Sequence, residues 1–168
     1  YAGQHRIVLD GCGELDPTSL DEYLLAGGYA GLANSLGAPQ EKAIDEVKAS
    51  GLLGRGGAYF PAAMKWGSAR KFPSPDRYVV VNCEEGEPGI FKDRHLMEGV
   101  PHRIVEGALI AAYAAGVHSI YIYINAEAEL STERMQQAVD QAAQAGIIGE
   151  DVLGSGYNVS VALRRGAG

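Results

Sequence analysis

Three short apolar runs, separated by two amphipathic stretches, dominate the second half of the sequence. The runs cover residues 78–81, 119–124 and 157–163, and they are rich in the β-branched and aromatic residues that are typical of strands. Between them, residues 101–115 and 129–145 carry apolar side chains at helical spacing. Strand, helix, strand, helix, strand predicts a parallel sheet with right-handed crossovers. The predicted fold class is therefore α/β.

The first fifty residues follow a different pattern, with short helical stretches separated by glycine. Ser19 and Glu22 have the spacing of a capping box, which predicts the start of a helix that stops at Gly27. We divide the sequence into an α-rich N-terminal segment, residues 1–50, and an α/β domain, residues 51–168.

The α/β domain is expected to be incomplete. The sequence stops at Gly166-Ala167-Gly168, directly after the last predicted strand. A glycine-rich turn from a strand into a helix is a common phosphate-binding element in α/β proteins, and here no helix follows. We therefore expect a piece of a larger protein, truncated at its C-terminus.

Composition excludes several classes of function. Lys and Arg number 14 against 21 Asp and Glu, a net charge of −7, which disfavours binding to nucleic acid phosphates. No apolar run approaches the roughly 20 residues that span a bilayer, so we expect no membrane insertion. The 2 cysteines are too few for a disulfide framework, a four-ligand zinc site or an iron–sulfur cluster. No nucleophile–base pair stands out, so hydrolytic chemistry has no support.

The densest motif places four glycines within seven residues, from Gly51 to Gly57. Such a loop can turn consecutive backbone N–H groups toward one anion, and Arg55 and Lys65 add positive charge beside it. It lacks the Gly-Lys-Ser/Thr of a P-loop and the preceding strand of a dinucleotide-binding fingerprint. A phosphate cradle and a flexible connecting loop are equally compatible with this composition.

A second motif, residues 82–89, follows the first predicted strand, at the end where parallel sheets bind ligands. Glu84, Glu85 and Glu87 can accept hydrogen bonds from ribose or ribityl hydroxyls, or from the carboxamide of nicotinamide. With Asp93 nearby they can instead hold a divalent cation, and a solvated surface turn is a third interpretation.

Taken together, the motifs resemble the NADH-binding flavoprotein subunit of respiratory complex I. Similar sequences occur in the diaphorase subunits of NAD-reducing hydrogenases and NAD-dependent formate dehydrogenases. The resemblance is carried, in order, by residues 51–66 (GLLGRGGAYFPAAMKW), 81–94 (VNCEEGEPGIFKDR) and 165–168 (RGAG). It implies a Rossmann-like, three-layer α/β domain that binds FMN and NADH. It also implies a ubiquitin-like domain and a helical domain with a 4Fe-4S cluster, both absent from this chain.

The resemblance further implies a role in electron input. A hydride passes from NADH to FMN, and electrons then move singly to iron–sulfur clusters and toward quinone. The implied partners are the other subunits of an NADH-oxidising complex, including an iron–sulfur subunit with a thioredoxin-like fold. The implied location is the cytoplasm or the cytoplasmic side of the inner membrane. We expect this piece alone to lack turnover; a hydrogenase or formate dehydrogenase diaphorase and a flavin-less scaffold domain are the alternatives.

The resemblance assigns binding residues and no proton-transfer catalyst, because hydride transfer requires the alignment of two rings. Phe60 is implied to stack on adenine and Glu87 to lie on the NADH side. No metal ligand is assigned. The implied FMN-binding residues are Gly54, Arg55, Gly56, Gly57, Lys65, Asn82, Glu84 and Glu85.

Five positions depart from the family pattern. Tyr59 stands where glycine is usual, Ala62-Ala63 where threonine–glycine is common, and Glu84 where aspartate is common. Ser68 replaces a second adenine-stacking aromatic found in some members. We expect these changes to affect nucleotide affinity and the preference for NAD or NADP. A ring at Tyr59 that filled the cofactor space would favour the scaffold alternative.

Overall fold

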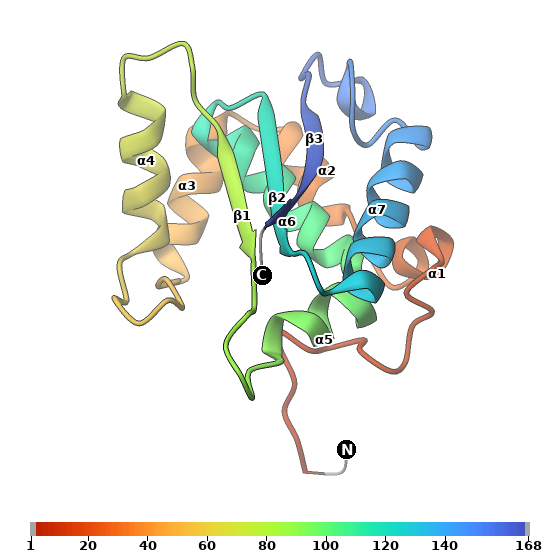
Figure 1. The fold of residues 1–168 in the computed structure, drawn as a ribbon. Coiled ribbons are helices and arrows are strands. Elements are labelled where there is room, and N and C mark those ends of the chain that lie inside the picture. The colour runs from red at the N-terminus through yellow and green to blue at the C-terminus, as the bar shows by residue number, and fades with distance from the viewer. Residues whose placement is uncertain (1–2, 167–168) are drawn as a thin grey trace.

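The computed structural model describes residues 3–166, in which helices cover one face of a parallel sheet (Figure 1). None of the helices in this part of the chain is long and apolar enough to cross a membrane. The elements, in chain order, are α1 (Leu20–Leu25), α2 (Ala30–Leu36), α3 (Gln40–Ala49), α4 (Ala62–Lys71), β1 (Val79–Cys83), α5 (Lys92–Gly99), α6 (Pro101–Ala115), β2 (Ser119–Asn125), α7 (Glu129–Gln144), the short 3-10 helix η1 (Val152–Gly154) and β3 (Ser160–Gly166).

The sheet confirms the predicted α/β class. Its strands lie in the order β1-β2-β3 and both pairings are parallel, with Val79 beside Ile120 and Ile120 beside Val161. The third strand begins later than predicted, because Val159 forms an antiparallel bridge with Gly149 before the chain reaches β2. As a result the residues just before β3 pair with the loop that follows α7 rather than with the sheet.

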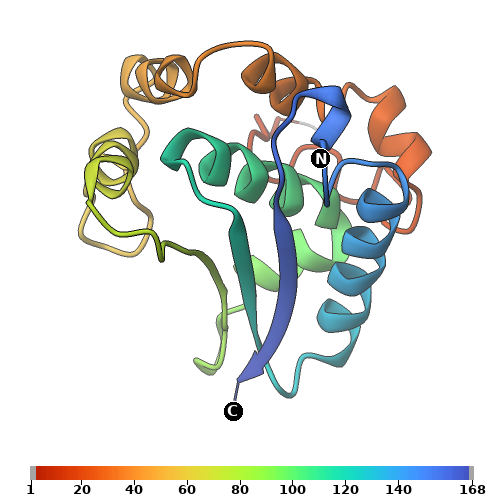
Figure 2. The ribbon, with the colours of Figure 1, turned by 90° about the horizontal axis from the view of Figure 1, so that it is seen from above.

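One face of the sheet carries the core. Ile120, Ile122 and Ile124 are at most 1% exposed and belong to the buried cluster formed with α6 and α7. On the opposite face Val80 is 63% exposed and Tyr123 36% exposed. Figure 1 looks onto this open face, and Figure 2 shows α6 and α7 on the other side. Of the three expected layers, residues 3–166 therefore form the sheet and one helical layer.

The predicted cap at Ser19 is present, but only half of the capping box forms. Ser19 Oγ accepts a hydrogen bond from the Glu22 backbone N–H at 3.2 Å. The Glu22 carboxylate accepts instead from the Asp16 backbone N–H at 2.7 Å. The glutamate therefore fixes the approach to α1 rather than closing the reciprocal bond.

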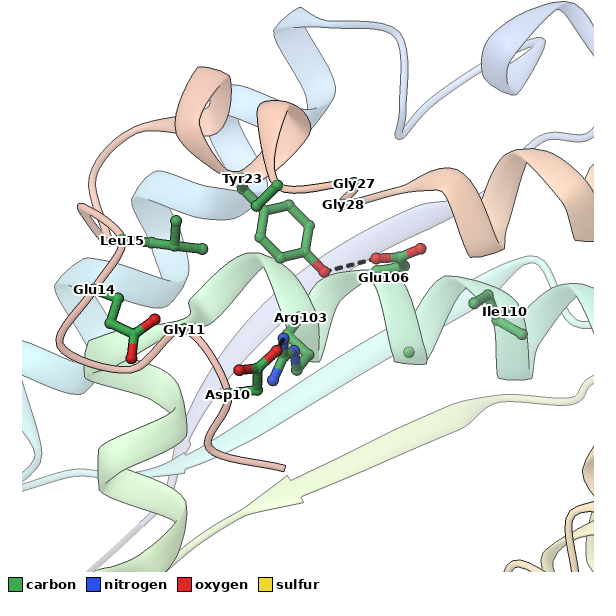
Figure 3. A pocket seen from close by; sticks show the side chains of 12 residues that line it. Asp10, Gly11, Glu14, Leu15, Tyr23, Gly27, Gly28, Arg103, Glu106 and Ile110 are labelled. Carbon is green, nitrogen blue, oxygen red and sulfur yellow. Dashed lines mark hydrogen bonds and ion pairs between the residues drawn. The ribbon is translucent and has the colours of Figure 1, made fainter. Parts of the chain in front are cut away.

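The start of α2 depends on a carboxylate from α6. Tyr29 at its N-cap has a left-handed φ of 61° and offers no side-chain cap. Glu106 supplies the missing acceptors: Oε2 accepts from Tyr29 N at 2.9 Å, and Oε1 accepts from Leu32 N at 3.2 Å. The same Oε2 accepts the Tyr23 hydroxyl at 2.6 Å, as the dashed line in Figure 3 shows. One side chain thus fastens α1 and α2 to α6.

A buried histidine completes this attachment. His102 is 2% exposed, and its Nε2 lies 2.9 Å from the side-chain oxygen of Gln141. Because the Gln141 amide nitrogen donates to the Thr18 carbonyl at 2.7 Å, the Gln141 oxygen accepts and His102 Nε2 donates. His102 Nδ1 then accepts from the Tyr29 hydroxyl at 2.9 Å. Burial lowers the pKa of His102, which favours this neutral form.

Replacing Glu106 by alanine is expected to lower the free energy of unfolding by about 3 kcal/mol, because buried donors at Tyr23 and Tyr29 lose their acceptor. Urea unfolding measures this loss. Glu133→Ala, at an exposed position of α7, is the control and should change the value by less than about 0.5 kcal/mol. Equal losses in the two variants would contradict a special role for Glu106.

Candidate functional site

The glycine-rich motif forms a loop pinched at its base. Leu53 and Pro61 face each other in an isolated antiparallel bridge, and residues 54–60 project between them. The helix α4 begins directly after the loop, at Ala62. The first turn of a helix carries unpaired N–H groups and the positive end of the helix dipole, so the loop opens beside an anion-attracting end.

The loop backbone has conformations that suit glycine. Gly57 has a φ of +93°, and a Cβ added there or at Gly56 would meet no non-adjacent heavy atom of residues 3–166 within 4 Å. At Gly54 an added Cβ would lie 3.4 Å from the Phe60 carbonyl oxygen. Tyr59, which departs from the family pattern, also has a left-handed backbone, with a φ of 50°. Glycine adopts this conformation without steric cost, which explains why glycine is usual at this position. Its side chain is 66% exposed and therefore does not pack into the base of the loop.

Two positively charged side chains lie in or next to the loop. Arg55 and Lys65 are exposed, and among residues 3–166 neither forms an ion pair. The Phe60 ring is 51% exposed at the end of the loop. These groups are free to meet a ligand from solvent.

The acidic motif forms the turn after β1. Asn82 Oδ1 accepts from the Glu84 backbone N–H at 3.1 Å, which closes a tight turn at the strand end. The half-buried Glu84 carboxylate is bonded through Oε1 to Nδ2 of Asn125, at the end of β2, over 2.9 Å. Glu87 is exposed. Sequence reasoning did not predict Asn125; the available signal was a polar residue ending an apolar strand next to a strand that also ends in a polar motif.

Glu85 turns away from the open side of this turn. Its side chain is 5% exposed and its two oxygens accept from the backbone N–H groups of Asp93 and Arg94, at 2.8 and 2.9 Å. These groups begin α5, whose N-cap residue Phe91 offers no side-chain bond. Lys92 Nζ lies 3.9 Å from the same carboxylate. In this arrangement Glu85 caps α5 and fixes the turn.

The carboxylates do not gather into a metal site. Among residues 3–166, no three His, Cys, Asp or Glu side chains are arranged to hold a metal ion. The nearby Cys83 is 4% exposed, and burial, with smaller contributions from Asp93 and Glu85, raises the pKa of its thiol to about 12. The Cys83 thiol is therefore protonated at neutral pH.

The structure places the two motifs at the same end of the molecule. In Figure 1 the loop between α3 and α4 and the turn after β1 both lie at the carboxyl end of the strands. The third motif, residues 165–168, also reaches this end, although its last two residues lie outside the described part. Within it, Arg165 donates to the Ala126 carbonyl, and a side chain at position 166 would have to displace the Tyr123 ring.

Cavities of the described chain lie elsewhere, beside α4 and α6 among other places. A groove of about 410 Å³ between α4 and β1 shares only Lys65 with the predicted site. The pocket in Figure 3, about 470 Å³, lies around Arg103 and Glu106, and its lining includes none of the predicted cofactor-binding residues. The predicted residues therefore line an open end of the sheet rather than an enclosed cavity.

Comparison with known protein families shows which family this chain resembles. The family model described as the Nuo51 FMN-binding domain matches residues 47–167, which include the glycine loop and the acidic turn. The chain belongs to this family. The recognition from sequence motifs is thereby confirmed, as is the relation to hydrogenase diaphorase subunits.

Individual relatives come from both kinds of complex. The "NADP-reducing hydrogenase subunit HndC" of Solidesulfovibrio fructosivorans is 43% identical over 165 residues, 98% of this chain and 34% of that protein. A subunit of the NADH-quinone oxidoreductase of Rhizobium meliloti is 43% identical over 150 residues, 89% of this chain and 36% of that protein. The chain thus spans about a third of the length of these relatives.

A solved structure agrees with the fold. The crystal structure of an NAD+-reducing [NiFe]-hydrogenase in the H2-reduced state aligns with a TM-score of 0.73 and 28% identity. The alignment covers 98% of this chain and 26% of the hydrogenase chain. The whole described fold, including the N-terminal helices, therefore has a counterpart in that protein.

Replacing Glu85 by alanine is expected to accelerate hydrogen exchange at the Asp93 and Arg94 amides about tenfold, because these N–H groups lose a charged cap. Exchange followed by NMR measures the effect. The exposed neighbour Glu87→Ala serves as the control and should leave both amides unchanged. Unaltered protection in Glu85→Ala would show that the capping bonds do not hold α5.

Proposed function

We propose that this domain binds FMN across the glycine loop and the acidic turn, and that the bound flavin receives a hydride from NADH. The observation that carries the proposal is the family membership of residues 47–167 together with an open, cation-flanked glycine loop at the start of α4.

The residues present fit FMN. The phosphate would lie against the N–H groups of the loop and the first turn of α4, with Arg55 and Lys65 supplying positive charge. Ribityl hydroxyls would find acceptors at the exposed Asn82 and at the Glu84 carboxylate. Phosphate donors and hydroxyl acceptors thus lie on separate elements at one end of the sheet, as the two polar parts of FMN require.

When bound, FMN supplies the chemistry, because it accepts a hydride from NADH and releases electrons singly to iron–sulfur clusters. The chain contributes alignment. The exposed Phe60 ring is available to stack on adenine, and Glu87 is available on the nucleotide side. Glu85 acts indirectly, by fixing the turn that carries Glu84. Holding the nicotinamide and flavin rings side by side would make hydride transfer an effectively unimolecular step.

We further propose an electron-input role within a larger oxidoreductase at the cytoplasmic side of the inner membrane or in the cytoplasm. One supporting relative belongs to an NADH-quinone oxidoreductase, and partners of this chain would then include an iron–sulfur subunit. The hydrogenase subunit HndC supports a second version of the role, a hydrogenase diaphorase, because it is 43% identical over 98% of the chain. The flavin step is common to both.

Gly57→Val is expected to weaken FMN binding at least about tenfold, because a branched side chain at a left-handed position distorts the loop and fills the space before it. Quenching of flavin fluorescence measures the dissociation constant. Gly27→Val is matched, since Gly27 has a φ of +89° and the same surrounding space, and it should bind within about twofold of wild type.

Anaerobic addition of NADH to the FMN complex of a chain extended to the length of its relatives then tests the hydride step, since loss of the oxidised flavin absorbance band reports reduction. Absence of saturable FMN binding by the unaltered chain would overturn the proposal in favour of a flavin-less scaffold. Binding of FMN without reduction by NADH in a chain extended to the length of its relatives would overturn the hydride step alone.

A further inference from the structure

Asn125 is a buried amide at the edge of the candidate flavin site. It is 8% exposed, it ends β2, and it lies beside the turn that follows β1. Its Nδ2 donates to Glu84 Oε1 at 2.9 Å, and its Oδ1 accepts from the Glu127 backbone N–H at 2.8 Å. A buried polar group costs free energy unless it is hydrogen bonded, and here both ends of the amide are satisfied.

The two bonds determine which way the amide faces. The Glu127 N–H can only donate, so it requires the oxygen of Asn125. The nitrogen must then point at Glu84. Turning the amide over would place its oxygen against a carboxylate and its NH2 against an N–H group, and both bonds would be lost.

Because Gly86 has no side chain, it leaves the space that the Glu84–Asn125 pair occupies. A Cβ added at Gly86 would lie 2.6 Å from Glu84 Oε1 and 3.1 Å from Asn125 Nδ2, so a side chain cannot be accommodated without displacing the pair. Within residues 3–166, hydrogen bonds engage Oε1 of Glu84 and leave Oε2 to accept from a ligand. The carboxylate is thus held in place before any ligand arrives.

We propose that Asn125 is the positioning residue that holds Glu84 as an acceptor for a ribityl hydroxyl of FMN. The inference rests on the proposed function. Glutamate has one more rotatable bond than the aspartate expected at position 84, and a free side chain would lose that freedom on binding. The Asn125 amide removes most of this freedom in advance, which lowers the entropic cost of binding the flavin.

The test compares FMN dissociation constants, measured by fluorescence quenching, among single and double variants of the chain. Asn125→Asp sets a second carboxylate against Glu84 and is expected to weaken binding about tenfold. Asn125→Ala, which adds no repulsion, is expected to weaken it about fivefold. Asn34→Asp adds the same charge at an exposed position of α2 and should stay within about twofold of wild type.

The double variant Asn125→Asp with Glu84→Gln reverses the polarity of the pair. The new amide donates to the new carboxylate, its own oxygen remains an acceptor, and the net charge returns to that of wild type. Most of the affinity lost in Asn125→Asp should therefore return, and a return of affinity among variants of equal thermal stability would separate positioning from a merely structural role for Asn125. Thermal unfolding of each variant without FMN reports stability separately from binding.

Two results would overturn the inference while leaving the proposed function intact. One is wild-type FMN affinity in both Asn125→Asp and Asn125→Ala. The other is a double variant that binds no better than Asn125→Asp although both are folded. Failure of the unaltered chain to bind FMN is a distinct result, which would overturn the proposed function and this inference with it.

Discussion

Helices that begin without a local cap leave backbone N–H groups in need of acceptors, and in this protein two glutamates from other elements provide them. Glu106 reaches from α6 to the start of α2, and Glu85 reaches from the turn after β1 to the start of α5. Each side chain does more than cap the start of a helix. Glu106 fastens the N-terminal helices to the central helix of the domain, and Glu85 fastens the acidic turn to the layer beneath it.

This arrangement explains how an open site can be held in a defined shape. The residues that would contact FMN lie on loops, and loops are the least constrained parts of most proteins. Here the glycine loop is pinched by the Leu53–Pro61 bridge, and the acidic turn is held by Glu85 and Asn125. Arg55, Lys65, Phe60 and Glu87, by contrast, are exposed, and among residues 3–166 the two cations form no ion pair. The side chains that hold the acidic turn in place are therefore different from those that are exposed to solvent.

The sequence predicts those parts of the structure that depend on local patterns. Alternating β-branched residues locate all three strands within a few residues, and helical periodicity gives the bounds of α6 without error. The helices α4 and α5 are not predicted. Their starts carry no capping side chain of their own, and the Glu85 cap of α5 belongs to a different segment. A pattern of neighbouring residues carries no information about such a partner.

The same limit applies to the site. The glycine loop and the acidic turn are visible as motifs, and parallel-strand geometry predicts that the turn lies at a ligand-binding end. Pattern alone does not reveal that Glu85 faces α5 whereas Glu84 is held by Asn125, because both facts depend on contacts between strands and helices. The described chain also shows one sheet face open, and it spans about a third of its relatives.

The central claim is that FMN binds across the glycine loop and the acidic turn. The most direct test is a titration of the isotopically labelled chain with FMN, followed residue by residue in two-dimensional NMR spectra of the backbone amides. The account predicts that saturable shifts concentrate at residues 54–60, at the first turn of α4 and at residues 82–87. Shifts concentrated instead around Arg103 and Glu106, in the pocket of Figure 3, would contradict it.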